Sequence, residues 1–85
     1  MEYLIAVFRS RTQVMKFYEK LLDCGRFADV VNTPRQASLG CGLSVKFGCD
    51  DFYFVQRILK SDCFHSFAGL FKVTESGHHK SVKAL

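Results

Sequence analysis

The chain has 85 residues, of which 48% are hydrophobic and 14% aromatic, and it carries a formal net charge of +4. This length allows one domain, and so many aromatic side chains exclude a chain that is disordered throughout. No apolar run approaches the roughly 20 residues of a membrane-spanning helix, and the N-terminus has an acid where a signal peptide would carry basic residues. We therefore expect a cytoplasmic protein that is not bound to a membrane.

The first third of the chain predicts a strand followed by a helix. Residues 2–9 contain a short apolar run bounded by charges, which is typical of a strand that is covered on both faces. Ser10 is a suitable helix N-cap, and Gln13 completes the pattern of a capping box. Gly25 is expected to end the helix in the left-handed conformation. The apolar face of this helix follows the spacing i, i+3, i+4, i+7, i+8 and comprises Val14, Phe17, Tyr18, Leu21 and Leu22.

The middle of the chain predicts two more strands. Residues 27–32 form an apolar segment that Pro34 ends. Residues 43–47 alternate between apolar and polar side chains, so the third strand is expected to turn Ser44 and Lys46 toward solvent. One face of this strand would therefore lie against the core and the other would be open.

The last third predicts a helix and a strand. The helix is expected to be capped by Asp50 or Asp51 and to place Val55, Ile58 and Leu59 on one face. Residues 67–74 predict the fourth strand. From this order we predict an α+β fold, namely a ferredoxin-like βαββαβ sandwich in which a four-stranded antiparallel sheet carries two helices on one face. The domain would span residues 1–75, and residues 76–85 would form a flexible C-terminal tail.

The segment NTPRQASLGCG, residues 32–42, places a thiol between two glycines. In the predicted topology the first strand ends where the third begins, beside the start of the first helix. Nearby cations and a helix N-terminus favour the thiolate form of a cysteine, and glycine neighbours leave it accessible. The groups expected to converge at this end of the domain are Arg9, Arg11, Arg35 and Cys41.

Other interpretations of these residues stay open. Cys41 is also compatible with a small buried side chain, and the three arginines with a solvated surface. The remaining cysteines, Cys24, Cys49 and Cys63, have no flanking glycine pair, and the cysteine spacing matches no zinc site. Because the sequence predicts no signal peptide and has enough apolar residues for a core, reduced thiols are expected. The sequence predicts neither a metal nor a cofactor.

The spacing P-R-x-x-S-x-G-C-G-L, residues 34–43, resembles the signature of the selenium/sulfur carrier protein-like family, a small bacterial domain. The opening from Tyr3-Leu4 to Phe8 also fits, and the resemblance extends to about Leu59. It implies that Cys41 holds a persulfide or selenopersulfide for transfer. The candidate binding residues are Pro34, Arg35, Ser38, Gly40 and Gly42 of this motif, together with Arg9 and Arg11, which the predicted topology brings to the same end of the domain.

A protein of this kind turns over nothing by itself, so it is expected to be a carrier protein more than a stand-alone enzyme. The implied partners are a cysteine desulfurase or another sulfur or selenium donor, and an acceptor protein. A homodimer is compatible with the sequence. The alternative is a regulatory module that binds a small molecule or anion, with Cys41 structural. RNA binding ranks last, because Ser44 and Lys46, not aromatic residues, occupy the expected solvent face.

Overall fold

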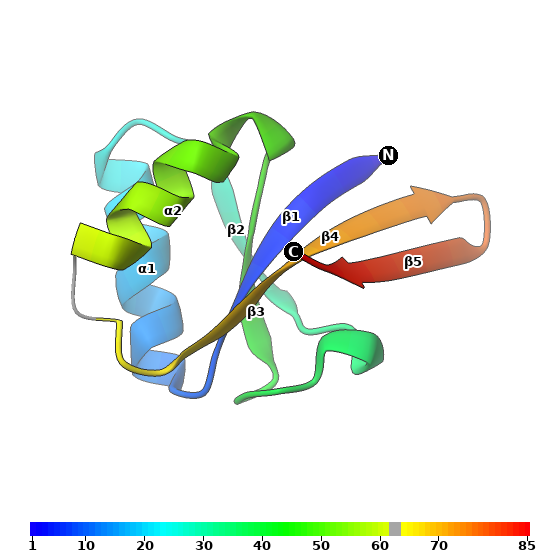
Figure 1. Ribbon diagram of the computed structural model, residues 1–85, viewed down its shortest axis with the longest axis horizontal. Coiled ribbons are helices and arrows are strands. Elements are labelled where there is room, and N and C mark those ends of the chain that lie inside the picture. The colour runs from blue at the N-terminus through cyan, green and yellow to red at the C-terminus, as the bar shows by residue number, and fades with distance from the viewer. Residues whose placement is uncertain (62–63) are drawn as a thin grey trace.

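The computed structural model describes residues 1–61 and 64–85, which form a five-stranded sheet with two α-helices (Figure 1). The sheet order is β2-β3-β1-β4-β5, and all neighbouring strands are antiparallel. Figure 1 shows the helices together at one side, with the hairpin of β4 and β5 extending away from them. The elements are β1 (Glu2–Phe8), α1 (Arg11–Asp23), β2 (Ala28–Asn32), the 3₁₀ helix η1 (Arg35–Ala37), β3 (Leu43–Phe47), the 3₁₀ helix η2 (Cys49–Asp51), α2 (Phe52–Ser61), β4 (Phe67–Ser76) and β5 (His79–Ala84).

The α+β class holds, but the predicted four-stranded ferredoxin-like βαββαβ topology is wrong. Strand β5 pairs with β4 from Phe71↔Ala84 to Ser76↔His79 and makes a fifth strand of residues that the sequence analysis left outside the sheet. Its sequence, HKSVKA, has one residue, Val82, that packs against a core. An edge strand needs no continuous apolar side, because its outer edge and one of its faces can remain in water.

The main core lies between the sheet and the two helices. Helix α1 buries Val14, Phe17 and Leu21, and α2 buries Val55 and Ile58. These side chains meet one face of β1, and the rings of Phe8, Phe17 and Phe64 pack with centroids 5.3–5.8 Å apart. Burying one such side chain completely stabilises the folded state by about 1.5–3 kcal/mol relative to leaving it exposed.

A second, smaller core covers the other face of the sheet. It is formed by Ile5, Val7, Ala37, Phe71 and Val73, and Ala37 comes from η1. Because η1 closes this face, the prediction that β3 turns Ser44 toward solvent is wrong.

Ser44 is fully buried, and its hydroxyl lies 2.5 Å from that of Thr33. Lys46 is half-buried, and its Nζ lies 4.3 Å from the centre of the Tyr3 ring. A polar side chain with a local partner can occupy a covered face at small cost.

The start of α1 confirms one prediction and corrects another. Ser10 is the N-cap, and its hydroxyl accepts a hydrogen bond from the Gln13 backbone N–H at 3.4 Å. The Gln13 side chain does not complete a capping box. Its Oε1 accepts from the backbone N–H of Ser66 at 2.9 Å and from the Ser66 hydroxyl at 2.6 Å. Gln13 therefore connects α1 to the segment that leads into β4. At the other end of α1, Gly25 adopts the expected positive φ of 75°.

Helix α2 begins through a 3₁₀ turn, so Asp50 and Asp51 lie within η2 instead of capping α2 directly. The Asp51 carboxylate accepts a hydrogen bond from the Arg26 guanidinium at 3.1 Å. The same guanidinium lies 4.1 Å from the centre of the Phe54 ring. Arg26 thereby joins the chain after α1 to the start of α2.

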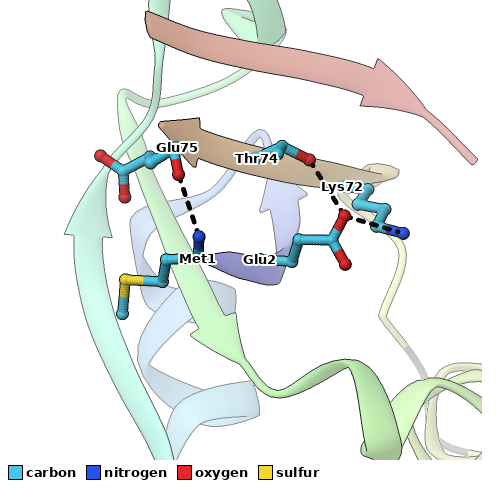
Figure 2. Close-up of polar contacts among 5 residues, drawn as sticks. All are labelled: Met1, Glu2, Lys72, Thr74 and Glu75. Carbon is cyan, nitrogen blue, oxygen red and sulfur yellow. Dashed lines mark hydrogen bonds and ion pairs between the residues drawn. The ribbon is translucent and has the colours of Figure 1, made fainter. Parts of the chain in front are cut away.

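Polar contacts also hold the N-terminal end of β1 against β4 (Figure 2). The Met1 ammonium donates to the carbonyl oxygen of Glu75 at 2.9 Å. The Glu2 carboxylate accepts from the Thr74 hydroxyl and lies 3.4 Å from the Lys72 ammonium. These groups are solvent-accessible, so each pair is worth at most about 1 kcal/mol.

Candidate functional site

Cys41 lies between η1 and β3, half-buried against the edge of the main core. Its backbone N–H donates to the carbonyl oxygen of Phe8 at 3.2 Å. Its thiol donates to the carbonyl oxygen of Leu43, with 3.8 Å between sulfur and oxygen. Phe8 is the last residue of β1, and α1 begins at Arg11. The backbone of Cys41 is therefore held beside Phe8, at the end of β1 that leads into α1.

The two glycines around Cys41 have separate steric reasons. A Cβ on Gly40 would collide with the carbonyl oxygen of Phe8 and lie 3.3 Å from Cα of Arg9. Gly42 adopts a φ of +90°, which strains any residue with a side chain. Its carbonyl accepts from the backbone N–H of Thr33 at 2.9 Å. Gly40 therefore lets the backbone approach β1, and Gly42 turns it into β3.

Two of the predicted arginines lie at this same end of the sheet. Arg9 follows β1 directly, its side chain is exposed, and its backbone N–H donates to the carbonyl oxygen of Ser66 at 2.8 Å. Arg11 is the exposed first residue of α1. Both residues therefore lie in the chain close to Phe8, on which the backbone of Cys41 is anchored.

The other predicted residues belong to η1. Pro34 is the N-cap of η1, Arg35 is its exposed first residue, and Ser38 is its C-cap. Figure 1 shows η1 displaced from the end of β1, and η1 contacts β5. Among the described residues, no hydrogen bond or ion pair joins the guanidinium of Arg9, Arg11 or Arg35 to Cys41. Arg35 thus lies on η1, whereas Cys41 follows between η1 and β3.

The residue that fixes Cys41 most directly is one that the sequence analysis missed. The carbonyl oxygen of Phe8 accepts from Cys41, and the same oxygen excludes a side chain at Gly40. A backbone carbonyl has no signature in the sequence of its own residue. The available signal was Gly40, since glycine is required where two backbones approach closely.

The other cysteines differ in their surroundings. Cys24 and Cys49 are exposed and unpaired, and Cys63 lies outside the described residues. Cys24 lines a hollow of about 290 Å³ between the helices, together with Lys20 and Arg57. In residues 1–61 and 64–85, no three His, Cys, Asp or Glu side chains gather in a way that could hold a metal ion. No helix in these two ranges has the length and apolar character needed to cross a membrane.

Comparison with protein-family models finds a match over most of the chain. A family model described as "Putative Se/S carrier protein-like" matches residues 3–65 of the chain. The matched range includes Cys41 and both glycines and ends before β4. Neither the curated proteins nor the solved structures contain a match to this chain.

Proposed function

Because the chain belongs to the Se/S carrier protein-like family, we propose that it carries sulfur or selenium on Cys41, as a persulfide or selenopersulfide, in the cytoplasm. The observation that carries this proposal is the placement of Cys41. Its backbone is anchored on Phe8, and neither flanking glycine tolerates a side chain. Cys41 is half-buried, which suits a residue that must be protected from solvent and still be reached by a partner.

The loading step is a thiol–persulfide exchange. The Cys41 thiolate attacks the terminal sulfur of a donor persulfide, a new S–S bond forms to Cys41, and the donor's own S–S bond breaks. The donor leaves as a thiolate, so the exchange is redox-neutral. Delivery is the same reaction with a thiolate of the acceptor protein as the nucleophile. The donor would be a cysteine desulfurase or a related enzyme.

The surrounding residues have distinct roles in this proposal. The Cys41 thiol must break its hydrogen bond to the Leu43 carbonyl and give its proton to solvent before the thiolate attacks. Arg9 and Arg11 would stabilise the anionic persulfide from the end of β1 and the start of α1. Pro34, Arg35 and Ser38 would hold the conformation of the segment before Gly40 and contact the partner protein.

The test is sulfur loading by a cysteine desulfurase with L-cysteine, followed by intact-mass analysis and cyanolysis. We expect the chain to gain one sulfur that cyanide removes. The Cys41→Ser variant should gain none, whereas the matched variants Cys24→Ser and Cys49→Ser should load normally. Loading that persists in Cys41→Ser would contradict the proposal.

A second candidate is a module that binds a small anion, with Cys41 as a structural residue. The observation that favours it is the contact of Cys41 with the main core and with the Leu43 carbonyl. This alternative predicts that sulfate or phosphate binding survives Cys41→Ser and is lost in Arg35→Ala. Isothermal titration of both variants separates it from the carrier.

A further inference from the structure

The two edges of the sheet differ in how they are protected. Strand β5, at one edge, carries His79, Lys80 and Lys83 among its six residues. Basic side chains on an edge strand discourage pairing with another chain. Strand β2, at the other edge, has the sequence ADVVN, with Asp29 as its one charged residue. The β2 edge is thus the less protected of the two.

The hydrogen-bond pattern shows which groups of β2 point outward. The Thr33 N–H donates to the Gly42 carbonyl, so this pair is of the hydrogen-bonded kind. Hydrogen-bonded pairs alternate along an antiparallel ladder, and the register of β2 with β3 places the next ones at Val31 and Asp29. The backbone groups of Ala28, Val30 and Asn32 therefore face the open edge. Among the described residues, no strand pairs with them.

Exposed apolar side chains flank this edge on the two faces of the sheet, Phe27 on the face of the second core and the α1 residues on the helix face. Phe27, which precedes β2, is 92% exposed, and Met15 and Leu22 of α1 are 41% and 45% exposed. Met15 and Leu22 are seven residues apart, so they lie on one flank of the helix. Lys20 and Cys24, on the other flank, line the hollow against α2. The flank with Met15 and Leu22 therefore faces away from α2, on the side of the β2 edge.

We propose that a second copy of this chain pairs with β2 in antiparallel orientation, about a two-fold axis at Val30. In this register Val30 lies opposite Val30 of the second copy, and Ala28 opposite Asn32. All the outward backbone groups then form hydrogen bonds, because the same three residues face outward in both copies. Phe27 comes opposite Thr33 of the second copy and diagonal to its Val31, so its exposed ring becomes covered.

Helix α1 supports the same arrangement from one face of the sheet. It packs over β2, β3 and β1, so its axis lies about one strand spacing inside β2. The two-fold axis lies half a spacing outside β2, which places the two copies of α1 side by side on one face of the joined sheet, about 14 Å apart, a gap that long side chains on their facing flanks bridge. The copies run antiparallel, so Arg11 of one approaches Glu19 of the other. Met15 lies midway between these opposite charges.

The test is sedimentation velocity of the full chain under reducing conditions, which excludes linkage through Cys24 or Cys49. We expect a dimer. Phe27→Lys and Met15→Lys should each weaken it by at least about tenfold in Kd. Tyr53→Lys is the matched control, because Tyr53 is 77% exposed on α2, away from this edge, and its loss should leave the Kd unchanged. Circular dichroism would verify that each variant folds.

Two charge variants test the register itself. Glu19→Arg should weaken the dimer, and the added change Arg11→Glu should restore it. The two Asp29 carboxylates would lie diagonally across the new seam, so Asp29→Asn should tighten the dimer by about threefold. A wild-type chain that is monomeric at about 100 µM, or a dimer that ignores both Phe27→Lys and Met15→Lys, would overturn the proposal. Sulfur loading of Cys41 is measured separately, so failure of one proposal is distinguishable from failure of the other.

Discussion

Gly40 carries the tightest steric constraint near the candidate site. A methyl group at this position would collide with the carbonyl oxygen of Phe8. We expect Gly40→Ala to lower the free energy of unfolding by about 1–3 kcal/mol, because the segment must move away from β1. It should also reduce sulfur loading of Cys41, since the hydrogen bond from Cys41 to Phe8 would be lost. Urea unfolding and the loading assay measure the two effects.

Gly48 provides the control for this substitution. It has a φ of −74°, and a Cβ there would meet no atom within 4 Å. Gly48→Ala should therefore be neutral or stabilise the protein by up to about 1 kcal/mol, through a less flexible unfolded chain. Equal destabilisation by the two substitutions would show that the contact with Phe8 is not the cause.

Tyr3 predicts a dependence of stability on alkaline pH. Burial, followed by the charge of Glu75 and a hydrogen bond to it, raises the pKa of the Tyr3 hydroxyl above its usual 10.0. Because the pKa of Tyr3 is higher in the folded than in the unfolded state, the contribution of Tyr3 to the free energy of unfolding is complete below pH 10. This contribution is lost as the pH rises through the folded-state pKa of Tyr3. The free energy of unfolding should therefore fall less steeply above pH 10 in Tyr3→Phe than in the wild type, as measured by urea unfolding at each pH.

At the residue scale, the sequence made Cys41 and its two glycines recognisable, because glycine on both sides of a cysteine signals a backbone constraint. The contact partner was not recognisable, because it is a main-chain oxygen of Phe8. Arg35 was expected near Cys41; it lies on η1, and its approach to the thiol stays a prediction. Whether a long exposed side chain meets a thiol depends on the path of the loop, which residue spacing does not determine.

Among the secondary-structure elements, β5 allows a direct test of whether a strand packs against the core, because it has one inward and one outward residue side by side. Val82 packs against the second core, whereas Ser81 is exposed on the opposite side of the strand. We expect Val82→Ala to cost about 1 kcal/mol of stability and Ser81→Ala almost nothing. Thermal unfolding of both variants measures the difference. No effect of Val82→Ala would mean that β5 contributes no packing to the folded protein.

The elements with strong patterns were predicted closely. Strand β3 was expected at residues 43–47 and is found there, and β1 and β2 each differ by one residue from the prediction. Strand β5 was missed, because its sequence has one core-facing apolar residue and three basic ones. The sheet also has a second covered face, which the alternation in β3 could not reveal. A buried serine with a threonine partner has the same pattern as an exposed serine.

For the whole molecule, η1 connects the candidate site to the rest of the fold. Ala37 is fully buried in the second core, whereas its neighbour Gln36 is exposed. Ala37→Gly should therefore cost about 0.8 kcal/mol more than Gln36→Gly, which has the same backbone effect without a buried methyl group.

The transition should also stay cooperative in Ala37→Gly. Circular dichroism and tyrosine fluorescence should shift to one common midpoint, because the second core belongs to the same folding unit as the first. Separate midpoints for the two signals would show that η1 unfolds independently of the sheet.

The second core also limits how other molecules can approach this protein. With helices over one face of the sheet and η1 over the other, the middle of the sheet offers no flat platform on which nucleic-acid bases could stack. Other molecules must therefore approach the sheet at its edge strands or at the turns where its strands end. Cys41 lies on the turn that leads into β3, and β2, the neighbour of β3, is an edge strand.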